Sequence, residues 1–419
     1  MMKIDLIKQF RKNNLAVYAA RFILVMIIVA TLADLLANEK PIICSYKGKI
    51  YYPVFHAYLV DVGLSRWQND FQNKEWSSLH YDWTLFPPIP YLPQNIDKNN
   101  MHSVSPFAIQ QVPSKHWKHW MGTDELGHDL LSAMIHGTRI ALLVGLVSMS
   151  IAGFIGIVLG SAAGYFGDEH LKITWTELLF NIFFLFLAFF YGFGIRSYIL
   201  KDAISISVLN FFPSLLLSLL IFLAVFYTGN RLGKLAGTLP ILNKKVYIPI
   251  DIIICRLIEI MNSIPVLFLI ISIISIAKPS LLLVMAIIGL TGWTGIARFI
   301  RAELLKIRSL EFIEAAYALG FSERRTLFRH AIPNAIAPVL IAIAFGIAGS
   351  ILLESTLSFL GIGVPPETLT WGSLLSEARQ SPSAWWMAVF PGMAIFLTVT
   401  VYNLAGEGLS DALDPRLRK

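Results

Sequence analysis

Eight apolar stretches constrain the fold of this 419-residue chain more than any other feature. A helix needs roughly 20 mostly apolar residues to cross the hydrocarbon core of a bilayer, because each residue adds about 1.5 Å to its length. The stretches satisfy this loosely and predict an all-α fold, a polytopic transmembrane helical bundle of about eight helices. They cover residues 15–36, 139–165, 176–196, 205–227, 250–277, 280–300, 334–359 and 385–406.

Composition and charge agree with a membrane protein. Hydrophobic residues make up 56% of the chain and charged residues 15%, whereas soluble domains are usually about half apolar and a quarter charged. Basic residues gather at the N-terminus, between Arg231 and Lys245, between Arg298 and Arg329, and in the C-terminal tail. Eight crossings place all four groups on one side, and the positive-inside rule makes that side the cytoplasm. The net charge of +7 is therefore explained by topology, with both termini cytoplasmic, and not by nucleic-acid binding.

The first apolar stretch also has features of a secretory signal, because Lys3, Lys8, Arg11 and Lys12 precede it. However, the apolar run is long, and no clear small-x-small cleavage site follows it. We therefore expect an uncleaved first membrane helix.

The loop before residue 334 combines helical signals with a glycine stop. Ser309 is expected to cap a short helix that begins near Leu310. Gly320 is expected to end that helix in the left-handed conformation, and Ser322 to begin a second one. Small and large apolar side chains alternate along this loop, and charged side chains surround them. A helix–turn–helix of this composition is suited to lying in a partner's groove.

Glu314, Ala315 and Ala316, followed by Gly320 and Pro333, resemble the EAA loop of permease subunits in binding-protein-dependent ABC importers. Four further segments narrow the resemblance to the C-type permease of the dipeptide and oligopeptide branch. They are His119 to Leu142, Glu354 to Pro366, the pair Trp371 and Gly372, and Leu404 to Lys419. Segments of this kind are weak evidence singly and strong evidence in this order.

The resemblance implies a membrane-spanning subunit that translocates di- or oligopeptides by alternating access. Its implied partners are two ABC ATPase subunits, a companion permease subunit, a substrate-binding protein and the lipid bilayer of the inner membrane. No cofactor, metal or catalytic residue is implied in this chain, since ATP and Mg belong to the ATPases. The residues implied in ATPase coupling are Glu314, Ala315, Ala316, Gly320, Arg324, Arg325, Arg329 and Pro333.

The motifs that this chain lacks agree with ATP binding on other subunits. The chain contains no GxxxxGK[ST] phosphate loop, so ATP is expected to bind elsewhere. It also contains no GxSxG or HExxH motif, which argues against a hydrolase. Two other readings stay open: an ion-coupled secondary transporter, which requires intramembrane carboxylates and usually internal repeats, and a membrane scaffold or receptor subunit.

The predicted organisation is a six-helix importer-permease core with one inserted helical hairpin. Relatives pass almost directly from the turn at 162–168 to the helix that begins at Asp251, whereas this chain inserts about eighty residues. The predicted regions are the cytoplasmic N-terminus and first helix 1–37, the extracytoplasmic cap 38–138, the second core helix 139–168, the inserted pair 169–249, and the core domain 250–419 with coupling loop 301–333.

The outer segment is rich in proline, tryptophan and tyrosine, which suits a folded cap at the membrane surface. Contact with a binding protein and packing against the companion permease are both compatible with it. Thr123 is expected to cap a helix that begins at Asp124. Asp124 with His128, and His116 with His119, have the spacing of metal ligands on one helical face, but no closed set of ligands appears and a structural role is favoured.

Few polar residues mark a pathway through the bilayer. Asn262 and Ser263, followed by Pro265, form a break where a helix can bend, and Glu354 is placed near the outer end of its helix, at substrate or at the surface. These are weak candidates. Cys44 and Cys255 are expected to be structural and unpaired.

Overall fold

The computed structural model describes residues 8–68, 70–71, 75–168, 172–206, 208–239, 244–276, 279–365 and 368–413. The chain divides into two compact units. Unit 1 comprises Met1–Ser161 and Ile258–Lys419, and unit 2 comprises Ala162–Leu257. The lysine Lys3 and the basic tail after Leu413, on which part of the orientation argument rests, lie outside the described residues.

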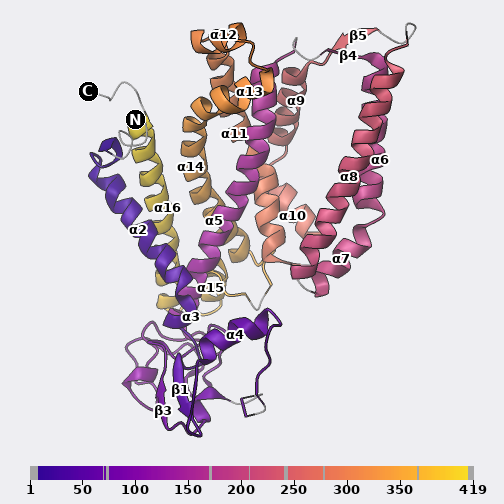
Figure 1. Ribbon diagram of the computed structural model, residues 1–419. Helices are drawn as coiled ribbons and strands as arrows, with labels where there is room; N and C mark the ends of the chain where they lie inside the picture. Colours follow the sequence, from indigo (N-terminus) through magenta and orange to yellow (C-terminus); the bar gives the residue numbers. More distant parts are fainter. Residues whose placement is uncertain are drawn as a thin grey trace. The chain divides into compact units, whose positions relative to one another are not determined.

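Long helices form the body of unit 1 (Figure 1). In chain order they are α2 (Asn14–Thr31), α5 (Leu130–Ser161), α10 (Val266–Ile276), α11 (Leu281–Ile307), α14 (Ile332–Phe359) and α16 (Trp385–Leu413), with the short helices α3 (Ala33–Leu36) and α15 (Trp371–Ala378). Helices α5 and α11 pack closely, since Gly156 of α5 lies against Ile296 and Trp293 of α11. Four of these helices meet at one hydrophobic core, which contains Val144, Ile270, Ile288 and Leu357.

The prediction of a polytopic membrane bundle is confirmed. Within the described residues, seven helical segments are long and apolar enough to cross a membrane, and the number is up to eight if a bent pair counts as one span. The bent pair is α9 (Ile250–Ser263) with α10, at an angle of 78°. Pro265 lies at this break, as the sequence predicts, because its ring cannot continue the hydrogen bonding of α9.

The start of α2 and the end of α16 lie together. Asn13 accepts a hydrogen bond from the backbone N–H of Ala16 and so caps α2, while its side-chain amide donates to Asp411 of α16 at 3.1 Å. Both helix ends lie at the end of unit 1 that carries the loop after α11 (Figure 1). This arrangement is the one that the basic residues predict, with the two ends and the loop on one side.

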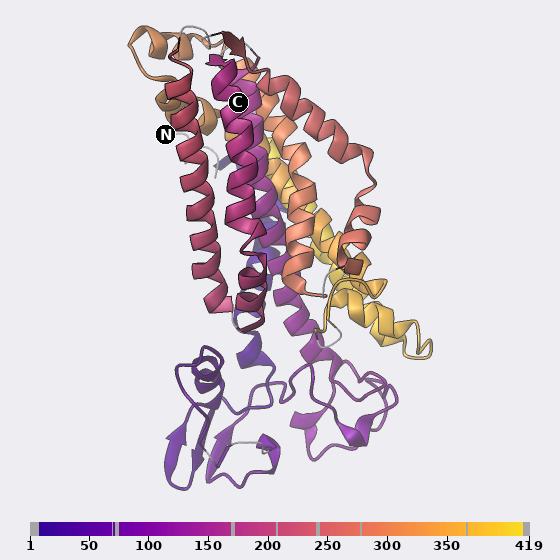
Figure 2. The same cartoon turned by 90° about the vertical axis from the view of Figure 1, so that its right-hand side faces the viewer.

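The described residues between 38 and 129 fold into a cap at the opposite end of unit 1 (Figure 2). A three-stranded antiparallel sheet has the order β2-β1-β3, from β1 (Ile43–Tyr46), β2 (Lys49–Tyr51) and β3 (Trp83–Leu85). One short α-helix, α4 (Pro53–Asp61), accompanies it, with the 3-10 turns η1 (Trp76–Ser78), η2 (Lys98–Asn100) and η3 (Lys115–Trp117). Stacked and tilted rings of Trp67, Phe71 and Trp76 fill its interior.

Unit 2 is built on a pair of apolar helices, α6 (Trp175–Phe189) and α8 (Val208–Ala236), joined through the π-helical turn η5 (Phe190–Gly194) and α7 (Ser197–Ile206). The π-helical turn η4 (Ala162–Phe166) precedes the pair. Thr174 and Glu177 form a capping box at the start of α6. Gly229 permits close approach of α8, since a Cβ there would lie 2.2 Å from the Phe184 side chain. Strands β4 (Lys172–Thr174) and β5 (Lys245–Tyr247) pair antiparallel at the base of the unit.

Candidate functional site: the loop after α11, the bent helix and the cap

A short amphipathic helix follows α11 and ends at a glycine. Helix α12 (Glu311–Ala318) is closed by hydrogen bonds from Gly320 N–H to Tyr317 O at 2.9 Å and from Phe321 N–H to Ala316 O at 3.0 Å. These two bonds form a Schellman motif, with Gly320 in the left-handed conformation at φ +77°. The predicted glycine stop is confirmed. No atom lies within 4 Å of a Cβ built on Gly320, so the constraint is backbone conformation alone.

The start of this loop differs from the prediction. Leu310, not Ser309, occupies the N-cap position of α12, and it provides no side-chain cap. The Ser309 hydroxyl instead donates to the carbonyl oxygen of Lys306 at 2.9 Å, because α11 continues to Ile307 and leaves open carbonyls there.

The second helix of the loop begins after Ser322, as predicted, and runs on into α14. Ser322 does lie at the N-cap of α13 (Glu323–Thr326), but its side chain makes no capping bond. A π-helical turn, η7 (Leu327–Ala331), then leads directly into α14. A π-turn widens the helix by one residue while keeping the backbone helical. The loop therefore joins α14 through continuous helical backbone.

The loop presents most of its implied coupling residues to the outside. Ile313 is fully buried and Ala316 is 5% exposed, so these two side chains anchor α12. Tyr317, Leu319 and Phe328 are 43%, 74% and 69% exposed. Of the implied coupling residues, those that are exposed are Glu314, Ala315, Gly320, Arg324, Arg325, Arg329 and Pro333.

A three-layer stack joins the turn to the π-helical segment. The Arg325 guanidinium lies 4.3 Å from the ring centroid of Phe321, and the Phe321 ring stacks on His330 at 5.9 Å with 15° between the planes. Cation–π and ring stacking contribute about 0.5–1 kcal/mol each at exposed sites. The stack holds the Gly320 turn against η7 and so connects the two halves of the loop.

A groove lies on the membrane body of unit 1, with a volume of about 590 Å³. Helices α11 and α14 provide most of its wall, through residues such as Gly295, Phe299, Phe345 and Gly349. The lining contains no charged side chain among the described residues that form it. Such a surface accepts groups that carry no net charge.

The predicted pathway residues separate in the structure. Asn262 lies at the end of α9, exposed, and its amide oxygen accepts a hydrogen bond from Thr294 of α11 at 3.1 Å. The Ser263 hydroxyl donates to the Glu259 carbonyl within its own helix. Glu354 is only 1% exposed and accepts from Ser358 at 2.6 Å, so it lies inside the helix packing and at neither the groove nor the surface.

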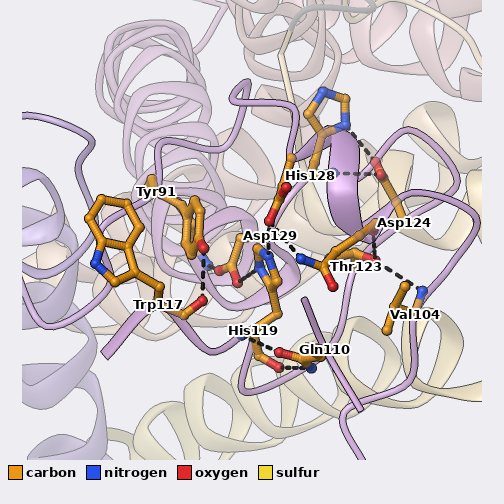
Figure 3. Close-up of polar contacts among 12 residues, drawn as sticks. Tyr91, Val104, Gln110, Trp117, His119, Thr123, Asp124, His128 and Asp129 are labelled. Carbon is orange, nitrogen blue, oxygen red and sulfur yellow. Dashed lines mark hydrogen bonds and ion pairs between the residues drawn. The ribbon is translucent and has the colours of Figure 1, made fainter. Parts of the chain in front are cut away.

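A buried histidine ties the cap to α5 (Figure 3). His119 is fully buried, and its two ring nitrogens lie 2.8 Å from Asp129 Oδ2 and 3.1 Å from Asp97 Oδ2. Burial alone lowers the pKa of His119, but the hydrogen bonds and charges of Asp129 and Asp97 outweigh it and raise that pKa above its usual value. Asp129 also accepts from Ser132 N–H at 2.6 Å and thereby caps α5. Tyr91 stacks on the imidazole at 4.4 Å.

A second cluster links the cap to α15. The His128 ring lies 2.6 Å from Asp124 Oδ2, which raises the pKa of His128. Burial, followed by the charge of Asp124, raises the pKa of Glu377 to about 7. Trp386 of α16 adds a hydrogen bond to the Thr123 carbonyl at 3.1 Å.

The predicted helix cap at Thr123 is wrong. Thr123 caps no helix: its hydroxyl donates to Asn100 O at 2.7 Å and accepts from Val104 N–H at 3.0 Å (Figure 3), and the next helix begins only at Leu130. Asp124 and His128 do meet, but in a turn and as an ion pair. The described residues contain no group of three or more His, Cys, Asp or Glu side chains arranged to hold a metal ion.

Sequence reasoning missed the roles of Asp97 and Asp129. One local signal was available, because Asp129 directly precedes the long apolar helix and aspartate is a preferred N-cap. No local signal connects Asp97 with His119, since 22 residues separate them. Neither Cys44 nor Cys255 takes part in a disulfide within the described residues, as expected.

The spanning helices and the bent pair define a polytopic membrane protein. The profile of a family described as binding-protein-dependent transport system inner membrane components matches residues 229–419. The chain belongs to this family of ABC transporter permeases.

Individual relatives support the same assignment. A protein of Brucella suis named putative peptide transport system permease protein is 37% identical over 302 residues, which cover 72% of this chain and 75% of that protein. The dipeptide transport system permease protein DppC of Alkalihalophilus pseudofirmus is 28% identical, covering 75% and 77%. The peptidoglycan transport system permease protein YejE of Agrobacterium fabrum is 26% identical and covers 98% of this chain and 92% of that protein.

Proposed function

We propose that this chain is one of two permease subunits in an ATP-driven importer of peptides, with its ATPases on separate chains. The observation that carries the proposal is the outward-facing loop from α12 to η7, set between two membrane-spanning helices. Its anchors point inward at Ile313 and Ala316, while its charged and aromatic side chains face outward. A partner that grips this loop moves α11 and α14 with it.

The proposed partner at the loop is an ATPase subunit. Glu314 and the three exposed arginines offer charge-assisted hydrogen bonds, which contribute about 1.5–3 kcal/mol each when partly desolvated. Leu319 and Phe328 offer apolar contact beside them. ATP-driven closure of two ATPases would then reach the bundle through the Phe321–His330 stack and the π-turn. The loop and both helix ends would lie in the cytoplasm, as the positive-inside rule predicts.

The groove of α11 and α14 is proposed as one wall of the translocation path, completed by the companion permease. The bend beside Asn262 and Ser263 supports this role, because irregular backbone at membrane depth is tolerated where it lines a cavity. Alternating access then requires only that this wall tilts as the loop moves. The cap is the proposed meeting place for a substrate-binding protein on the outer side.

Peptides are the proposed substrate class. The names of the relatives support it, since they specify peptides, dipeptides and peptidoglycan. The groove is consistent with it, because an uncharged lining tolerates varied side chains on a neutral amide backbone.

Purification of the chain from its native membranes in a mild detergent tests the assembly. ATPase subunits and a second permease are expected to copurify, and the reconstituted assembly is expected to take up peptide only with ATP. Uptake that follows an ion gradient without any ATPase would replace the proposal with an ion-coupled transporter.

A pair of substitutions at Gly320 tests coupling. Gly320→Val forces a β-branched residue into the left-handed region, whereas Gly320→Asn places there a residue that tolerates it. We expect the valine variant to reach the membrane in normal amounts but to lose at least tenfold in ATP-driven uptake, and the asparagine variant to retain most of it. Equal uptake by both variants at equal abundance would contradict the proposal that the loop passes movement on to α11 and α14.

Ala316 is a poor probe of the same idea, although the sequence alone suggests it. Its side chain is 5% exposed, so a bulky residue would disturb the anchor of α12 before it met any partner. The neighbouring Ala315 is exposed, and a larger residue there tests docking directly.

A further inference from the structure

A basic hollow lies on the outer face of α2, near its first residue. Four residues line it: Arg11, Asn14, Val17 and Arg21. Asn14, Val17 and Arg21 follow one another at spacings of three and four, which places them on one side of α2, and Arg11 joins them from the turn that precedes the helix. Both arginines are exposed, so two guanidinium groups and one amide face a common space.

The position of Arg21 is unusual for a helix of this kind. It is the only charged residue in α2, and it lies seven residues into the helix, about 10 Å along the axis. A charge at this depth is costly unless it reaches the interface and finds a partner. The guanidinium lies 5.8 Å from the ring centroid of Tyr18, one turn toward the helix start, which agrees with a side chain directed to the interface.

The protein supplies no acidic partner to this hollow within the described residues. No ion pair is formed there by Lys8, Arg11, Lys12 or Arg21. The neighbouring acid Asp411 is engaged by Asn13. Within the described residues, the hollow is therefore a cluster of positive charge.

The surroundings of the hollow indicate the source of its counter-ion. Ala16, Ala19 and Met26 are buried and form the packing face of α2, and the hollow lies on the other side. Tyr18 and Val25, at 64% and 54% exposure, continue this outer face toward the middle of the helix, where the bilayer covers it. The hollow thus opens at the boundary between lipid headgroups and acyl chains.

We propose that this hollow binds the phosphate headgroup of an anionic phospholipid, in the leaflet at the α12 end of the bundle. Arginine forks match phosphate oxygens in bidentate geometry, and the Asn14 amide supplies a further donor. Lys8 and Lys12 add long-range attraction to an anionic surface. The bound lipid neutralises Arg21 and fixes the depth at which α2 sits.

Native mass spectrometry of the full chain in detergent, titrated with phosphatidylglycerol or phosphatidylcholine, tests the site. We expect tighter retention of phosphatidylglycerol. The double variant Arg11→Gln, Arg21→Gln is expected to bind it roughly 25-fold more weakly, since each basic residue near an anionic surface contributes about fivefold. Arg21→Lys is expected to bind between the two, because it keeps the charge and loses the fork.

Arg231→Gln is the matched control. Arg231 also lies over a tyrosine ring, that of Tyr227 at 5.2 Å, but it belongs to unit 2 and not to the hollow. Its substitution is expected to leave phosphatidylglycerol binding unchanged, and an equal loss in both variants would overturn the site.

Three other results would overturn the proposal. Equal binding of the two lipids would remove the preference for anionic headgroups. Displacement of the lipid by millimolar inorganic phosphate would indicate a site for free anions. Loss of a copurifying subunit from the double variant, with lipid retention unchanged, would assign the face to a protein partner.

Discussion

The cap and the loop after α11 use polar residues in opposite ways. In the cap, His119, Asp97 and Asp129 are turned inward and bonded to one another, with His119 fully buried. In the loop, Glu314 and the arginines are turned outward, and two apolar residues hold the helix in place. Buried polar groups that satisfy one another fix a structure, whereas exposed ones are free to meet a partner. The difference separates a permanent attachment from the exposed surface that the proposed ATPase partner would contact.

Removing the His119 imidazole is expected to have the largest effect, because it disrupts the buried polar contacts of the cap. His119→Ala leaves the buried Asp129 and the half-buried Asp97 without the imidazole that both contact, and loss of one partner in a buried pair costs about 3–5 kcal/mol. We expect the cap to become sensitive to protease while the membrane helices remain protected. Limited proteolysis with mass spectrometry measures this, and a cap that stays resistant would show that aromatic packing alone holds it.

The pH dependence of the cap sharpens the contrast. Because the folded pKa of His119 is raised above its unfolded value of about 6.5, its stabilising contribution is complete below that value and is lost as pH rises through the folded pKa. The pKa of Asp97 is held below its ordinary value of 3.8: burial opposes this, and bonds from Asn100 and His119 outweigh it. Its contribution is present above that value and is lost as pH falls through the folded pKa. The cap is therefore expected to be most protease-resistant between pH 3.8, the ordinary pKa of Asp97, and about pH 6.5, the unfolded pKa of His119.

Glu377 adds a separate effect at its junction with α15. Its pKa is raised to about 7, so the folded state holds a proton that the unfolded state releases above about 4.5, and stability falls as pH rises between these values. Glu377→Gln keeps the neutral form at every pH. We expect this variant to match the parent at pH 5 and to exceed it in thermal stability at pH 8. An equal difference at both pH values would show that the carboxyl does not titrate in this range.

Substitutions on the loop are expected to have the smallest effect on stability. Glu314→Gln and Arg324→Gln alter exposed side chains, so each should change the free energy of unfolding by less than about 0.5 kcal/mol. The same variants should lose copurifying ATPase, which quantitative mass spectrometry measures. A large drop in melting temperature would mean that these charges serve the fold, and the contrast with the cap would fail.

Periodicity and turn chemistry predicted the parts of this molecule that depend on local sequence. The apolar stretches identified the spanning helices, and Gly320 was correctly placed at a left-handed helix stop, because no other residue takes that conformation as readily. The apolar stretch was taken to begin at Arg139, whereas α5 begins nine residues earlier at Leu130, after its cap at Asp129. Arg139 is in fact accommodated inside α5 by its bond to Asp34 at 2.7 Å.

The cap was predictable only as a folded, aromatic segment. Its order depends on pairs that are distant in sequence, such as His119 with Asp97 and Trp386 with Thr123, and local reasoning cannot reach them. The burial of Glu354 has the same origin, since a helix position does not by itself tell which neighbour covers it. The exposure of the coupling residues followed more directly from their polarity.

The pairing of β4 with β5 determines where the α6–α8 hairpin begins and ends. These two short strands bring residue 172 beside residue 247, so the chain enters and leaves the α6–α8 hairpin at one point. The hairpin therefore begins and ends at the same place in unit 2. Removing the hairpin would therefore require only a short loop between its two ends.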